Sequence, residues 1–297
     1  GGGPLVRPVV AYIPSGTTTA TTIPLPAAGL VSAGTGMDFS FDPARHAVYF
    51  AKSNVGTGDS LDASIGLFAI SSQTHQARLV TRFPTRSGCG ANADNLLVNT
   101  SVRGSVVVDP NRNLVYLIAR RCVPDPQRPT GSLTTVATTI VIDPRDGSST
   151  PIDDPGGVAS SPVSAVYNAA AGAVYVFSSV GGGSRQCGST TGRVSRVVGT
   201  EAAELASVCQ VSGGGNMARK MAVARNLNRI FVAQVKNDTP GVSSPGGLGV
   251  VDGTTLLTQP PLGSRQFAVL AVNNARAKVY AVDQANGSVS VFRSGSA

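Results

Sequence analysis

Short apolar stretches alternate with polar turns along the whole chain, and one arrangement of them recurs. In each copy an apolar strand is followed by a polar turn and by a second apolar strand that carries an aromatic residue. The copies are FSFDPARHAVYFA (39–51), VVVDPNRNLVYLI (106–118), SAVYNAAAGAVYVF (164–177), MAVARNLNRIFVA (221–233) and VLAVNNARAKVYAV (269–282). Because short apolar runs bounded by turn residues are typical of strands, each copy predicts a β-hairpin.

Two positions mark every copy of the repeat. The aromatic position is occupied by Tyr49, Tyr116, Tyr175, Phe231 and Tyr280. The turn begins seven residues earlier, at Asp42, Asp109, Asn168, Ala224 and Asn273. Asp and Asn side chains accept hydrogen bonds from the backbone that follows them, so they nucleate turns, whereas Ala224 lacks such a group.

Each copy is followed by a loop and further apolar strands, such as 65–71, 77–83, 138–147, 247–255 and 287–295. Asp-Gly pairs at 146–147 and 252–253 indicate tight hairpins. Repeated units of four antiparallel strands predict an all-β fold, a β-propeller of four-stranded blades. Five blades are expected, or six if the N-terminal hairpin recruits other strands. Segment 199–208 is either a short helix or the outer strand of the third unit.

The ends of the chain indicate how the ring closes. The last copy supplies three strands, and residues 8–26 form an N-terminal hairpin that lacks the first two strands of a unit. We expect the N-terminal segment to complete the last blade, since this removes an exposed sheet edge. Residues 1–7 are expected to be a flexible tether, and residues 8–297 a single propeller domain.

The repeat resembles the YVTN-type propeller repeats of bacterial surface and periplasmic proteins. The stretches DPNRNLVYLIARR, TTIVIDPRDGSST and NNARAKVYAVDQANGSVSVF carry the likeness, although the loops here are longer and the spacing is less regular. The resemblance implies a propeller fold and a periplasmic or cell-surface location. It implies no catalytic residues, because the motif of that family is structural.

The N-terminus and the charge bear on location and partners. The start GGGPLVRPVV is typical of the tether that follows the lipidated cysteine of a mature bacterial lipoprotein, an ordinary flexible terminus being the alternative. The net charge is +8, without any block of consecutive basic residues. This favours an acidic partner, such as another envelope or extracellular protein or an anionic glycan, over sequence-specific nucleic acid.

The four cysteines are scattered, and none occurs in a C-x-x-C pair, which argues against a zinc cluster. An even number of cysteines in a loop-rich chain suits disulfides and an oxidising compartment, with buried thiols as the alternative. The placement of the loops predicts the pairs Cys89–Cys122 and Cys187–Cys209, each of which would staple a long loop.

The long loops are expected on one face of the propeller. Segments 52–64, 119–134, 179–192 and 234–246 follow second strands, and segments 84–104 and 211–219 join units. Long loops that share one face of a rigid scaffold form the default binding surface. The candidate partner-binding residues on this face are Arg103, Arg120, Arg121, Arg128, Arg185, Arg219, Lys220, Asp59 and Asp62.

Catalysis is not expected from this pattern. Gly58-Asp59-Ser60-Leu61 spells the motif of GDSL esterases, but no histidine follows His75 to activate Ser60. His46 and His75 are expected on the face opposite the long loops, and no cofactor or metal site is predicted. We therefore expect a non-catalytic interaction propeller of the bacterial cell envelope. The alternatives are a metal-dependent propeller hydrolase or lactonase, and a subunit of an extracellular assembly or filament.

Overall fold

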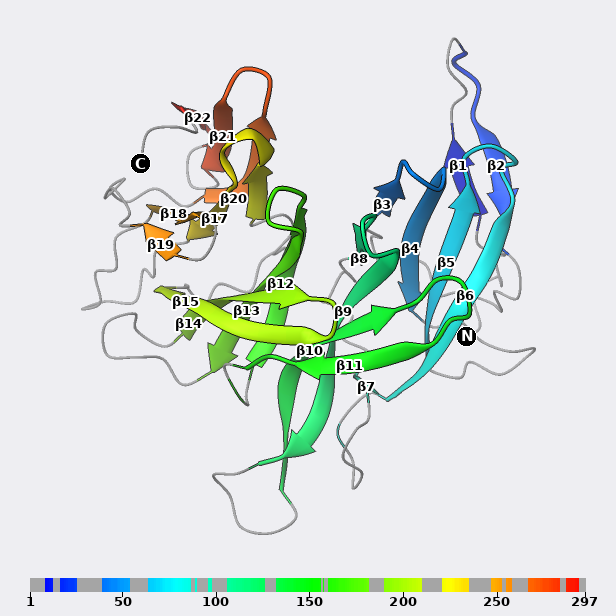
Figure 1. Ribbon diagram of the computed structural model, residues 1–297, viewed down its shortest axis with the longest axis horizontal. Coiled ribbons are helices and arrows are strands. Elements are labelled where there is room, and N and C mark those ends of the chain that lie inside the picture. The colour runs from blue at the N-terminus through cyan, green and yellow to red at the C-terminus, as the bar shows by residue number, and fades with distance from the viewer. Residues whose placement is uncertain are drawn as a thin grey trace. The chain divides into compact units, whose positions relative to one another are not determined.

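The computed structural model describes residues 9–12, 17–25, 39–53, 64–86, 89, 96–97, 106–125, 132–155, 157, 160–181, 190–209, 221–234, 247–252, 255–257, 267–283 and 287–293. These residues form β-strands joined by turns, with one short 3-10 helix, η1 (Arg225–Leu227) (Figure 1). Their pattern confirms the all-β prediction.

The strands form five antiparallel groups, which we call blades one to five. Blade one contains β3 (Phe39–Asp42), β4 (Ala47–Ser53), β5 (Ser64–Ser71) and β6 (Ala77–Arg86). Blade two contains β8 (Val106–Asp109), β9 (Leu114–Pro124), β10 (Leu133–Ile142) and β11 (Ser149–Asp153). Blade three contains β12 (Ser160–Asn168), β13 (Ala173–Gly181), β14 (Thr190–Val198) and β15 (Glu201–Cys209).

Blades four and five complete the series. Blade four contains β16 (Met221–Ala224), β17 (Arg229–Gln234), β18 (Gly247–Asp252) and β19 (Thr255–Leu257). Blade five contains β20 (Phe267–Asn273), β21 (Lys278–Asp283) and β22 (Val289–Arg293). Every copy of the repeat therefore forms the first hairpin of a blade, as predicted. Segment 199–208 is a strand, the outer one of blade three, and not a helix.

Three strands lie outside the blade pattern. The strands β1 (Val9–Tyr12) and β2 (Thr21–Pro24) pair with each other. The short strand β7 (Leu96–Leu97) pairs with β6 on one side and with β9 on the other, so blades one and two share one nine-stranded sheet. Among the described residues no strand pairs with the free edge of β22, so closure by the N-terminal segment stays a prediction.

Contacts divide the chain into two compact units. The first comprises residues 1–133 and 140–150, and the second comprises residues 134–139 and 151–297. In the first unit the core lies between blades one and two, where Tyr49 and Leu67 pack with Val108 and Leu117. The predicted tether, residues 1–7, lies outside the described residues, and the prediction of a single domain stays untested.

The second unit has two such cores. Tyr175 of blade three packs with Met221 and Ile230 of blade four. Phe231 of blade four packs in turn with Leu270 and Val279 of blade five. In blades one, three and four, the aromatic residue of the repeat therefore fills the space between its blade and the next one along the chain. Tyr280, in the last blade, is only half-buried.

The first turn of every blade has the same backbone form. Four residues after the start of the turn, the chain enters the left-handed region, with φ between 49° and 56°. The residues at this position are His46, Asn113, Gly172, Asn228 and Ala277. The predicted turn-nucleating side chains are also confirmed, since Asp42, Asp109, Asn168 and Asn273 all accept hydrogen bonds from following backbone amides.

Candidate functional site

Few of the predicted binding residues fall in the described part of the chain. Arg120, Arg121, Cys89 and Cys122 do, and for Cys209 the backbone alone is described. The remaining predicted residues lie outside the described ranges, namely Arg103, Arg128, Arg185, Arg219, Lys220, Asp59, Asp62 and Cys187. The pairing of Cys187 with Cys209 therefore stays a prediction, as does the role of those loop residues.

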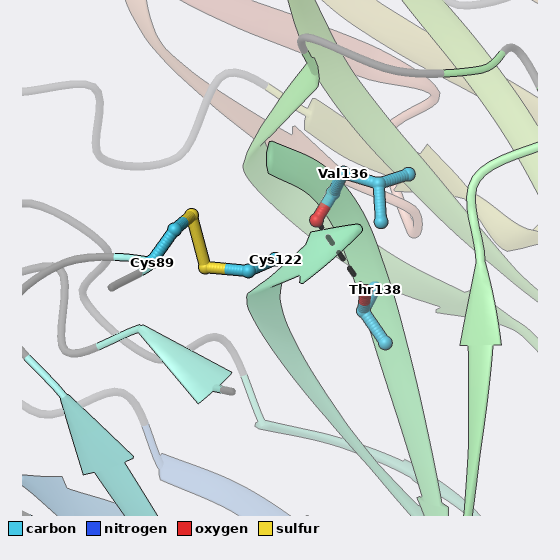
Figure 2. The surroundings of a disulfide bond; sticks show 4 residues. All are labelled: Cys89, Cys122, Val136 and Thr138. Carbon is cyan, nitrogen blue, oxygen red and sulfur yellow. Dashed lines mark hydrogen bonds between the residues drawn. A yellow bond between two sulfur atoms is a disulfide. The ribbon is translucent and has the colours of Figure 1, made fainter. Parts of the chain in front are cut away.

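The predicted disulfide between Cys89 and Cys122 is present, with the two Cα atoms 5.4 Å apart (Figure 2). Cys122 is fully buried near the end of β9. Beside it, Arg121 pairs with Leu96 of β7, so the connection between blades one and two is fastened to β9 twice. A covalent bond and a strand pairing thus brace this end of the first unit.

Arg120 and Arg121 do not form one cluster. Successive residues of a strand point to opposite faces, so the two guanidinium groups emerge on different sides of β9. Both are half-buried. Burial lowers the pKa of Arg120 from its ordinary value, because desolvation disfavours the charged form. Arg120 and Arg121 therefore lie in strand β9 and not in a loop.

Blade one contains a basic pair that the sequence analysis did not select. Lys52 of β4 lies opposite Gly66 of β5, and Gly66 lies opposite Arg82 of β6. Residues directly opposite one another share a face of the sheet, so the two cations flank a residue without a side chain. Their Cα atoms are about 10 Å apart, twice the strand spacing. No periodic signal marks them, because only the register of three strands brings them together.

The environment of this pair is unusual for two cations. Lys52 is 8% exposed, and desolvation lowers its pKa. Arg82 donates from Nε to the Oγ of buried Ser64, at 2.9 Å. Among the described residues neither cation has a carboxylate partner. Because buried charges are normally paired, the arrangement is suited to receive an anion.

The other end of blade one contains a cavity of about 340 Å³. Its apolar walls come from the β1–β2 hairpin and from blade one, and are formed by Val10, Ala11, Ile23, Phe39, Val48 and Ile70. One end is polar and is formed by Ser71, Ser72 and His75. Mainly apolar walls with a few convergent polar groups are typical of small-molecule sites, whose volumes begin at about 300 Å³.

Both histidines of the chain lie near this cavity. Ser72 donates its backbone N–H to the carbonyl oxygen of His46, at 2.7 Å, so the turns that contain His46 and His75 are adjacent. These turns join the first strand to the second and the third to the fourth, as the sequence analysis placed them. No sequence feature predicted a cavity there, because the hairpin that lines it is distant along the chain from the turn at His75.

Neither a metal cluster nor a membrane-spanning helix occurs among the described residues. They contain no group of three or more His, Cys, Asp and Glu side chains placed to hold a metal ion. They also contain no helix with the length and apolar character needed to cross a bilayer.

Comparison with known proteins supports the fold. No protein-family model and no curated protein matches the sequence. Among solved structures, the chain resembles an oligogalacturonate lyase from Vibrio parahaemolyticus, with a TM-score of 0.54 and 10% identity over 95% of this chain and 70% of the other. It also resembles Sqt1 from Saccharomyces cerevisiae, with a TM-score of 0.50 and 12% identity over 95% of this chain and 67% of the other.

A third similar structure is the acylaminoacyl peptidase from Pyrococcus horikoshii, with a TM-score of 0.50 and 14% identity. The match covers 96% of this chain and 39% of that one. Together with the repeated strand groups, these likenesses show that the chain has a β-propeller fold. They do not extend to the YVTN family or to lipoprotein status, which stay predictions.

The comparisons correct the expectation that the protein is not an enzyme. A lyase and a peptidase are among its structural neighbours, so the fold gives no argument against catalysis. The expectation rested on the lack of histidine on the long-loop face. A ligand-sized cavity lies at the other end of blade one, and His75 is part of it. The absence of histidine from the long-loop face was therefore not enough to exclude catalysis.

Proposed function

We propose that the protein is a binding propeller of the bacterial cell envelope that recognises an acidic partner at the long-loop end of its first unit. The observation that carries the proposal is the pair formed by Lys52 and Arg82 on either side of Gly66. A carboxylate or sulfate group between them would restore the electrostatic partner that both cations lack among the described residues.

The braced strand β9 supports the same location. The disulfide between Cys89 and Cys122 holds the connection between blades one and two against the strand that carries Arg120 and Arg121. A fixed surface loses little conformational entropy when a partner binds. The net charge of +8 adds long-range attraction for an acidic protein or an anionic glycan.

The disulfide also supports the proposed compartment. Structural disulfides persist in oxidising environments such as the periplasm and the cell surface. An envelope location, with the partner being another envelope protein, an extracellular protein or an anionic glycan, agrees with this bond.

The test uses heparin as the polyanionic probe, with binding measured over a salt series. Replacing Lys52 by Met removes the charge and keeps the length of the side chain. We expect affinity to fall about tenfold at low salt, since a charge-assisted contact is lost. The fold should be as stable as before or more so, because a buried charge without a carboxylate partner is replaced by an apolar group.

The matched control is Lys278→Met, which removes an exposed lysine of blade five. If both variants weaken binding equally, heparin is attracted by diffuse charge alone and the site proposed here is wrong. A loss confined to Lys52→Met, together with a similar loss for Arg82→Gln, supports it.

A further inference from the structure

We infer that the cavity of the first unit is a binding site for a small aromatic acid, and that His75 binds its acidic group. This site lies at the opposite end of blade one from the proposed partner-binding surface, and the inference does not depend on that proposal. Two features of the described residues carry it, namely the walls of the cavity and its polar end.

The walls provide an aromatic surface. Phe39, Phe50 and Phe68 stand next to one another across β3, β4 and β5, with ring centroids 5.3 Å and 5.4 Å apart. Phe50 and Phe68 are completely buried, whereas Phe39 is 51% exposed and lines the cavity. A flat apolar ligand would extend this ladder of rings by one member, and offset stacking adds to the gain from apolar burial.

The β1–β2 hairpin makes the opposite wall. Ile23 of β2 is buried against Phe50, Phe68 and Ile70, which fixes this hairpin on blade one. The same strand lines the cavity through Ile23, and β1 contributes Val10 and Ala11. The cavity therefore lies between two packed elements and is open to solvent on one side.

The polar end suits an acidic group. Ser71 Oγ accepts hydrogen bonds from the backbone amides of Gln73 and Thr74, which leaves its own O–H to donate. His75 belongs to the same turn and also lines the cavity. The lining residues include no Asp or Glu, so a carboxylate or sulfonate would meet hydrogen-bond donors and no like charge.

The backbone of His75 identifies a substitution that tests its side chain. Among the described residues, three turns share the same pair of backbone hydrogen bonds, those at 71–76, 143–148 and 283–288. In each, the fifth residue has positive φ, and it is Gly147 in blade two and Gly287 in blade five. Blade one has His75 there, at φ 56°. Glycine adopts this conformation without a steric penalty, so it can replace His75 without disturbing the turn.

The decisive variant is therefore His75→Gly. A role in ligand binding predicts that this variant stays folded, as circular dichroism would show, and binds less of the probe. The probe is anilinonaphthalenesulfonate, which joins an aromatic body to an acidic group. Its affinity should fall about tenfold, as for the loss of one charge-assisted hydrogen bond.

Two further variants complete the test. His46→Gly relieves the same backbone conformation in the adjacent turn, and should raise the Tm without changing probe affinity, because His46 does not line the cavity. Ala11→Phe fills the cavity and should abolish the saturable binding of one probe molecule per chain. Unchanged probe binding in either His75→Gly or Ala11→Phe would overturn the inference.

Discussion

The first turns of blades two and four have the same backbone form but are held in different ways. In blade two, Asp109 Oδ1 accepts from the amides of Asn111 and Arg112 at 3.0 and 3.2 Å, and Oδ2 accepts from the Arg112 guanidinium at 2.8 Å. Asp109 is 1% exposed. The turn is thus stabilised by its own residues, with a carboxylate that is buried and fully engaged.

In blade four the corresponding residue is Ala224, and the turn is the 3-10 helix η1, which has no side-chain cap. Its first amide, that of Arg225, donates to Asn274 Oδ1 of blade five at 2.7 Å. The residue that follows the helix, Asn228, accepts at Oδ1 from Asn168 Nδ2 of blade three at 2.6 Å. Neighbouring blades therefore supply the groups that the sequence of this turn lacks. The same backbone geometry can be stabilised by hydrogen bonds within the turn or by hydrogen bonds from adjacent blades.

The largest effect should come from removing the local side chain in blade two. Asp109→Ala loses two backbone contacts and one ion pair at a buried position, and should lower the free energy of unfolding by about 2–3 kcal/mol. Asp109→Asn keeps the amide acceptor and should lose about half as much. Urea denaturation measures both. Asp146→Ala, at an exposed turn, is the control, and equal losses at the two positions would contradict the difference drawn here.

A smaller effect is expected when the hydrogen bond that blade five provides to the turn of blade four is removed. Asn274→Ala should cost about 1–2 kcal/mol, because the Arg225 amide loses its acceptor. Hydrogen exchange should become faster at Arg225, although the substituted residue belongs to blade five. The matched control is Asn273→Ala, which removes the acceptor for Arg276 within blade five itself. If Asn274→Ala alters exchange only in blade five, blade four does not depend on its neighbour.

A substitution at the left-handed position of the turn can stabilise the protein instead of destabilising it. Ala277 has φ 49° where blade three has Gly172. Ala277→Gly should raise the free energy of unfolding by about 0.5–1 kcal/mol, since relief of strain exceeds the added entropy of the unfolded chain. Gly172→Ala should lower it by a similar amount. Thermal denaturation of the two variants would show opposite shifts, and shifts of the same sign would refute the common backbone form.

The smallest effect concerns pH. Hydrogen bonds from Arg145 lower the pKa of Asp143 from 3.8 to about 2. Because the folded pKa lies below the unfolded one, this contribution to stability is complete above about pH 4 and is lost as the pH falls toward 2. The turn at Ser71 has no carboxylate and should show no such dependence. Carboxyl chemical shifts followed by NMR in the wild type and in Arg145→Gln would measure the shift. The substitution should reduce it but not remove it, because the backbone amide of residue 145 still donates to Asp143 Oδ1.

The local features of the fold could be predicted from the sequence because they depend on neighbouring residues. The hairpins follow from alternating apolar strands and from turn residues such as Asp42 and Asp109, whose side chains reach their own backbone. The sequence also showed that Ala224 cannot stabilise its turn in this way, because alanine has no side-chain acceptor. The disulfide between Cys89 and Cys122 followed from the repeat, which places both residues at one end of blade two.

The candidate sites depended on contacts between residues far apart in the chain. Lys52 and Arg82 are separated by two strand pairings, and nothing near either residue in the sequence marks it as a ligand-binding group. The cavity beside His75 exists because the β1–β2 hairpin packs on blade one. By itself the sequence determined the repeated hairpins and their turns, since short-range hydrogen bonds and apolar patterning are local. Only the tertiary structure decided which charges share a face and where a cavity forms, because strand register and packing are properties of the assembled sheets.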